Sequence, residues 1–115
     1  MSAVYVNNIV INIGADFQQT FVLEAAATNS SLDLTNYTVS AQMRKWSGSS
    51  TAITFTTEKS YPETSGIIVL SLTSAQTSSI KPGRYVYDVI ITGVVDSSKT
   101  RVLEGMVLAR EGVTR

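Results

Sequence analysis

The sequence predicts an all-β fold: an immunoglobulin-like antiparallel β-sandwich of seven or eight strands, in a single domain covering residues 1–115. Apolar and polar residues alternate with a period of two along most of the chain, and clusters of Gly, Asn, Ser and Asp separate the alternating segments. Serine and threonine make up 29 of the 115 residues, and threonine suits the half-exposed face of a pleated strand. One helical signal, the capping-box spacing from Thr73 to Gln76, is too short for more than a single turn.

Each expected strand carries a row of apolar side chains that can face a core. Residues 3–13 form a first strand or a bent pair, interrupted at Asn7 and Asn8, and Gly14 turns the chain into the second strand. In that second strand Phe17 and Phe21 share one face. The later strands are expected within residues 37–46, 51–57, 67–73, 78–93 and 101–110.

The segment from Ile80 to Tyr85 has the order of parts found where the chain of an immunoglobulin-like sandwich crosses between its sheets. Ile80 is expected to enter the core, Pro82 and Gly83 to make the turn, and Tyr85 to bond the turn backbone through a buried hydroxyl. An ordinary half-buried strand tyrosine is the alternative reading of Tyr85.

The amino-acid composition disfavours most enzyme chemistry, metal sites and nucleic-acid binding. The chain has no cysteine and no histidine, so it lacks thiolate ligands, disulfides and the usual general base. Its acidic residues are dispersed singly, which disfavours a calcium loop of EF-hand type. Nine basic and nine acidic residues balance without a basic cluster, which disfavours direct nucleic-acid binding.

No apolar run is long enough to span a membrane. The first residues also lack a charged segment followed by an apolar one, so we expect a protein made and used without Sec export.

Four residues in the body of the chain are candidates for contact with other molecules. Arg44 and Asp88 are expected on the outer faces of neighbouring strands, as a cross-strand pair that is either exposed to solvent or buried beneath a partner subunit. Trp46 lies at a strand end, where it either anchors an interface or caps the open end of the sandwich. A sugar-binding platform formed by Trp46 and Tyr61, with the loop that follows Tyr61, is a further alternative.

Several segments together resemble small bacteriophage virion proteins. The segments are GADFQQTFVL, LDLTNYTVSAQMRK, SGIIVLSLTSAQTSSIKPGRYVYDVIIT and RVLEGMVLAREGVTR, so the resemblance runs from Gly14 to Arg115. They are similar to the N-terminal domains of baseplate upper proteins, which attach receptor-binding machinery to a phage tail. Those proteins have an Asp-Leu-Thr-Gly-Tyr turn that corresponds to residues 33–37 here. Asn36 stands at the position of its glycine, and asparagine also tolerates a left-handed turn.

The resemblance implies a non-enzymatic structural protein of the virion with no cofactor, assembled in the host cytoplasm, in the tail, baseplate or fibre-attachment region. It implies copies of the chain and other virion proteins as partners; a capsid-decoration or neck protein and a glycan-binding receptor module are the alternatives. Residues 1–8 precede the matching region and are expected to form an interacting arm. The expected interface residues are Val4, Tyr5, Val6, Arg44, Trp46, Asp88 and Arg115.

Overall fold

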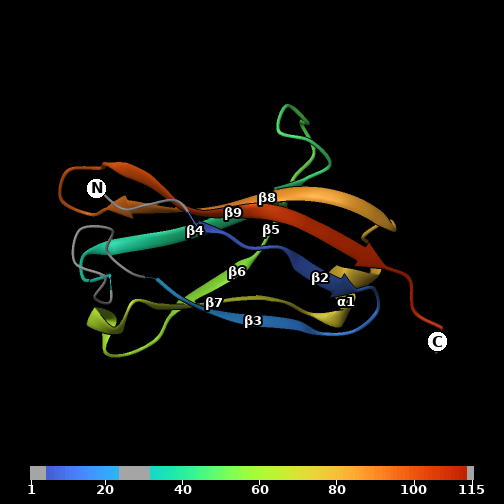
Figure 1. Cartoon of the computed structure of the whole chain (residues 1–115), viewed down its shortest axis with the longest axis horizontal. Coiled ribbons are helices and arrows are strands. Elements are labelled where there is room, and N and C mark those ends of the chain that lie inside the picture. Colours follow the sequence, from blue (N-terminus) through green and yellow to red (C-terminus); the bar gives the residue numbers. More distant parts are fainter. Residues whose placement is uncertain (1–4, 24–31, 114–115) are drawn as a thin grey trace.

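The computed structural model describes residues 5–23 and 32–113, which form two β-sheets packed face to face (Figure 1). The all-β sandwich predicted from the sequence is confirmed. The elements in chain order are β1 (Tyr5–Val6), β2 (Ile9–Asn12), β3 (Phe17–Val22), β4 (Tyr37–Arg44), β5 (Ile53–Thr54), β6 (Thr56–Lys59), the 3₁₀ helix η1 (Glu63–Ser65), β7 (Ile67–Leu72), α1 (Ser74–Ser78), β8 (Gly83–Gly93) and β9 (Lys99–Arg110).

The larger sheet, called sheet A, has the strand order β1-β9-β8-β4-β5, with β2 also paired to β9. The smaller one, sheet B, has the order β3-β7-β6. All pairings are antiparallel except those of β1 and β2, which run parallel to β9. The predicted antiparallel sandwich is therefore corrected at its first strand, because residues from the two ends of the chain lie side by side in the same direction.

Two expected strands are each divided in two, which accounts for nine strands in the described residues rather than seven or eight. Asn7 and Asn8 separate β1 from β2, and Phe55 separates β5 from β6. At Phe55 the chain crosses from sheet A to sheet B, because β5 pairs with β4 whereas β6 pairs with β7. This crossing closes one side of the sandwich, and the Thr57 hydroxyl bonds the Val39 carbonyl across it at 2.9 Å.

Apolar side chains from both sheets form one core, with Phe55 near its centre. The Phe55 ring lies 5.9 Å from that of Phe17 and 6.3 Å from that of Tyr87. The inward rows expected on the second and third strands are confirmed by the burial of Phe17, Phe21, Ala41 and Met43.

Strand β9 departs from simple alternation at Val102. Val89 of β8 pairs with Leu103 and Ile90 pairs with Arg101, so Val102 is an extra residue in a β-bulge. Both Val102 and Leu103 are buried as a result. The bulge sets which side chains of β9 point outward after it.

Residues 5–12 run along β9 in sheet A and do not form a free arm. Tyr5 and Val6 pair with Leu103 and Glu104, and the Asn7 amide donates to the Glu104 carbonyl at 2.9 Å. Residues 5–8 are therefore part of the framework, because they cover the edge of β9, and their contact with a neighbouring molecule stays a prediction. Residues 1–4 lie outside the described part.

The turns and the helix cap have the conformations that the sequence predicts. Thr73 and Gln76 form the reciprocal capping box of α1, a single turn of helix as predicted. Gly14 and Asn36 both have positive φ, at 88° and 64°. Ile80, at the corner after α1, is buried in the core.

Candidate functional site

The outer face of sheet A carries a stripe of apolar side chains where alternation would place polar ones. Met106 of β9 lies opposite Val86 of β8, and Leu108 lies opposite Val10 of β2. Together with Val6 these residues are all exposed large apolar side chains. We call this set, Val6, Val10, Val86, Met106 and Leu108, the outer stripe. Contiguous exposed apolar side chains of this kind mark interaction surfaces more often than scattered single ones do.

A groove of about 630 Å³ runs along the stripe. It is lined by Val6, Asn8, Gln42, Arg44, Ser47, Val86, Tyr87, Asp88, Arg101, Glu104, Gly105 and Met106. Three of the expected interface residues, Val6, Arg44 and Asp88, thus lie around one groove. Its lining combines an apolar centre with side chains of both charges.

The expected pair between Arg44 and Asp88 is not formed. Strands β4 and β8 are neighbours as predicted, but Arg44 lies opposite Val86 and Asp88 lies opposite Gln42. Asp88 instead pairs with Arg101 of β9, whose Nε lies 3.3 Å from Oδ2. The Arg44 guanidinium donates to the Ser49 carbonyl and to the Gln42 side chain, which ties it to the loop after β4. The register of β4 on β8 places Asp88 two residues away from the position opposite Arg44, which is why the expected pair does not form.

The groove rests on a partly buried contact between Asn7 and the two long strands, β8 and β9. The Tyr87 hydroxyl donates to the Asn7 carbonyl. A Cβ on Gly105 would lie 2.1 Å from that same carbonyl oxygen, so glycine is needed where Asn7 crosses β9. Burial raises the pKa of Tyr87 to about 12, because the charged phenolate would be poorly solvated there.

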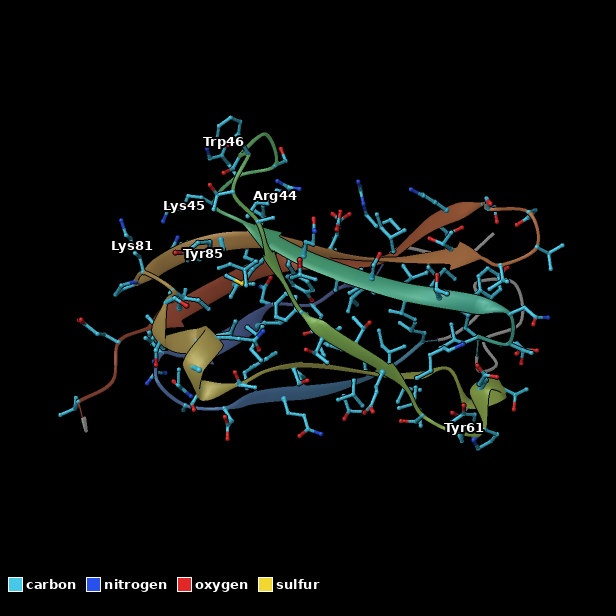
Figure 2. All side chains as sticks on the ribbon, turned by 180° about the vertical axis from the view of Figure 1, so that it is seen from behind. Arg44, Lys45, Trp46, Tyr61, Lys81 and Tyr85 are labelled. Atoms are coloured by element: carbon cyan, nitrogen blue, oxygen red, sulfur yellow. The ribbon has the colours of Figure 1, made fainter. Side chains whose placement is uncertain are left out.

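Trp46 projects from the loop between β4 and β5 (Figure 2). Its side chain is 61% exposed, so it does not cap the sandwich, and its role as an interface anchor stays a prediction. A Cβ on Gly48 would lie 2.0 Å from an indole carbon, which shows that the ring packs against its own loop. The neighbouring Ser47 lines the groove.

Tyr61 is also highly exposed, at 87%, but it lies at the other end of the molecule from Trp46 (Figure 2). Lys59, two residues before Tyr61, bonds the carbonyl of Tyr37 at the start of β4, whereas Trp46 follows the end of β4. The sugar platform that would combine the two aromatic residues is therefore wrong. The length of β4 separates them.

The corner before β8 has the expected hydrogen bond. The Tyr85 hydroxyl donates to the Lys81 carbonyl at 2.7 Å, so the corner assignment is confirmed in its geometry. The bond lies at the surface, which corrects the expectation of a buried hydroxyl. Gly83, with a φ of 143°, makes the turn.

Of the remaining expected interface residues, Val4 and Arg115 lie outside the described residues. The backbone of Tyr5 is placed in β1. Within residues 5–23 and 32–113, no three acidic side chains lie close enough to hold a metal ion. Neither helix in those ranges has the length and apolar character needed to cross a membrane.

Comparison with known proteins supports the fold. No family model and no curated protein sequence matches this chain. The crystal structure of Listeria monocytogenes InlP is similar to it, with a TM-score of 0.57 and 17% identity, over 95% of this chain and 28% of InlP. A family 123 glycoside hydrolase from Clostridium perfringens aligns with a TM-score of 0.42 and 12% identity, over 96% of this chain and 23% of the hydrolase.

The chain thus spans less than a third of either protein. At such low identity, the likeness to InlP shows an all-β fold and nothing about activity. The alignment with the hydrolase is too weak to add to it.

Sequence reasoning did not find Val10, Val86, Met106 and Leu108. A usable signal was present, because the last strand is apolar on both of its faces from Met106 to Ala109. A strand of this kind in an antiparallel sheet is covered on both sides, or it exposes an apolar row.

Proposed function

We propose that this protein is a non-enzymatic docking module of a bacteriophage virion, which assembles with copies of itself and with other virion proteins. The observation that carries the docking role is the outer stripe, an exposed apolar row on a rigid sheet. The virion context rests on the sequence motifs from Gly14 to Arg115. On the same basis, the proposed location is the tail, baseplate or fibre-attachment region.

The charges around the groove favour a second copy of this chain as one occupant. Asp88 and Glu104 share the single cation Arg101, at 3.3 and 3.8 Å, whereas Arg44 has no acidic partner in the part of the chain that is described. A surface that carries an apolar centre, surplus acidic groups and a separate cation can meet its own copy about a two-fold axis. Arg44 of one copy would then approach Asp88 of the other.

The proposed fold type is immunoglobulin-like. Sheet B has the order β3-β7-β6, and β4, β8 and β9 are successive in sheet A, which corresponds to the B-E-D and C-F-G groupings of that sandwich. The corner tyrosine, Tyr85, lies near the start of β8, the strand between β4 and β9, and bonds the turn before it, as the corner tyrosine of that sandwich does. A rigid sandwich of this type presents its sheet faces and edges to partners.

Sedimentation velocity of the full chain, over a concentration series, tests the docking role. We expect reversible self-association that Met106→Glu weakens at least about tenfold, because it places a charge in the apolar centre of the contact. Val95→Glu is the matched control, since Val95 is 88% exposed in the loop between β8 and β9 and away from the stripe. A monomer at every concentration, or equal effects of the two variants, would contradict self-docking through this face.

Immunogold labelling of phage particles with an antibody against this chain tests the virion context separately. Labelled tails or baseplates are the expected result. Particles without label would overturn the virion proposal and leave the self-association result standing on its own.

A further inference from the structure

A second hollow lies at one end of the sandwich, on a different surface from the groove. It is enclosed by the end of β4, the loop into β5, the end of α1 and the corner before β8, and its volume is about 840 Å³. Its apolar lining comes from Met43, Ile53, Ile80 and the ring of Tyr85, of which Met43 and Ile80 belong to the buried core. We call this hollow the end pocket.

The rim of the end pocket is positively charged. Lys45 and Lys81 line it, and no acidic side chain does. Neither lysine forms an ion pair within residues 5–23 and 32–113, in contrast to Lys59, which pairs with Glu63. Figure 2 shows Lys45, Lys81 and Tyr85 at the same end of the molecule.

Contacts around Tyr85 hold both lysines at this rim. The Lys45 ammonium lies 4.9 Å from the centre of the Tyr85 ring, a cation–π arrangement. A Cβ on Gly83 would lie 2.7 Å from that ammonium, so glycine leaves the room that Lys45 occupies. The hydrogen bond from the Tyr85 hydroxyl to the Lys81 carbonyl holds the backbone of Lys81 beside the same ring.

We propose that the end pocket binds an extended acidic segment of a partner protein, in which a carboxylate neighbours a large apolar side chain. The two ammonium groups complement the carboxylate, and the apolar lining accepts the adjacent side chain. Polar side chains of Thr51, Thr54 and Gln76 also line the pocket and can bond the backbone of an extended segment. The inference is independent of docking through the outer stripe, because the two surfaces share only Arg44.

The test is a titration of the full ¹⁵N-labelled chain followed by two-dimensional NMR. The probe is the peptide acetyl-Glu-Phe-Asp-Leu-amide, and the matched control is acetyl-Gln-Phe-Asn-Leu-amide, which has the same shape without charge. We expect the acidic peptide to shift amide signals of residues 43–54 and 76–85, with much smaller shifts from the neutral peptide. The double variant Lys45→Ala with Lys81→Ala is expected to raise the Kd at least about tenfold.

Lys99→Ala provides the control for a general loss of positive charge, since Lys99 begins β9 and does not line the pocket. Its Kd is expected to equal that of the unmodified chain. Equal shifts with both peptides, equal effects of the lysine variants, or shifts confined to the outer stripe would overturn the proposal. The same shifts with sodium acetate alone would also overturn it, since they would indicate a site for small anions.

Discussion

At the scale of single residues, Tyr85 links the turn geometry to the end pocket. Its hydroxyl closes the corner on the Lys81 carbonyl and its ring lies beneath Lys45. The two contacts use different parts of the side chain, so a phenylalanine keeps the ring and loses the hydrogen bond. Tyr85→Phe therefore tests the stability of the corner while it keeps the ring that Lys45 contacts.

We expect Tyr85→Phe to lower the free energy of unfolding by about 1 kcal/mol, the typical net contribution of one such hydrogen bond. Tyr61→Phe is the control, because that side chain is 87% exposed. Urea denaturation monitored by circular dichroism gives both midpoints. The same midpoint for the two variants would mean that the corner bond adds no stability.

The raised pKa of Tyr87 predicts that the stability of the protein falls at alkaline pH. Its folded-state pKa is about 12, above the ordinary value of 10.0, so the folded protein keeps this proton more tightly than the unfolded chain does. The stabilising contribution is complete below pH 10 and is lost as pH rises through 12. Its upper limit is about 3 kcal/mol.

Tyr87→Phe removes the group that titrates and also its bond to the Asn7 carbonyl. We expect the variant to be less stable than the unmodified chain by about 1 kcal/mol near neutral pH. Above pH 10 its stability should fall less steeply, so the difference between the two proteins shrinks. Urea denaturation at several pH values measures this, and parallel curves up to pH 12 would refute the assignment.

At the scale of elements, the contact of β1 with β9 depends on Gly105. The Asn7 carbonyl lies so close to this residue that a Cβ would meet its oxygen at 2.1 Å. Because the neighbour is backbone, it cannot move aside by a rotamer change. A side chain at this position must displace the N-terminal segment from the edge of β9.

We expect Gly105→Ala to destabilise the fold by about 1–3 kcal/mol, the usual range for overpacking. In a chain that lacks residues 1–8 the same substitution should cost much less, because the clashing carbonyl is gone. The double-mutant cycle uses four proteins: the full chain and the chain without residues 1–8, each with and without Gly105→Ala. Chemical denaturation of all four gives the coupling free energy between Gly105 and the N-terminal segment. Equal costs in both backgrounds would show that Gly105 is needed for another reason.

At the scale of the whole molecule, residues 5–8 contribute to the fold as well as to the surface. Removing Met1 to Asn8 deletes the bond from the Asn7 amide to Glu104, the bond from Tyr87 to Asn7 and the bond from the Met106 amide to the Asn8 side chain. It also deletes Val6 from the outer stripe. The truncation should therefore affect stability and self-association together.

The truncated chain is expected to stay folded, since the core residue Ile9 and the rest of β2 remain. We expect it to lose about 2–3 kcal/mol of stability, the sum of the lost hydrogen bonds, and to self-associate more weakly. Circular dichroism during thermal unfolding and light scattering measure the two effects. Unchanged stability together with unchanged association would contradict both roles for this segment.

The sequence by itself determined the all-β fold, the main inward-facing rows and the local turn chemistry of Gly14, Asn36 and the capping box of Thr73. These features depend on residues close together in the chain: strand alternation repeats every two residues, and a cap needs partners three residues apart. The corner at Tyr85 was predictable for the same reason, since its hydroxyl bonds a carbonyl four residues away.

Tertiary structure alone decided which strands lie beside β9 at the edge of sheet A, and in which register neighbouring strands pair. Parallel pairing of β1 with β9 joins residues about a hundred positions apart, and neither alternation nor turn signals encode such a partner. The bulge at Val102 directs Met106 and Leu108 outward, and the register places Asp88 beside Arg101 instead of Arg44. The outer stripe and the end pocket consist of side chains from segments far apart in sequence, so they exist only once the sheets have formed.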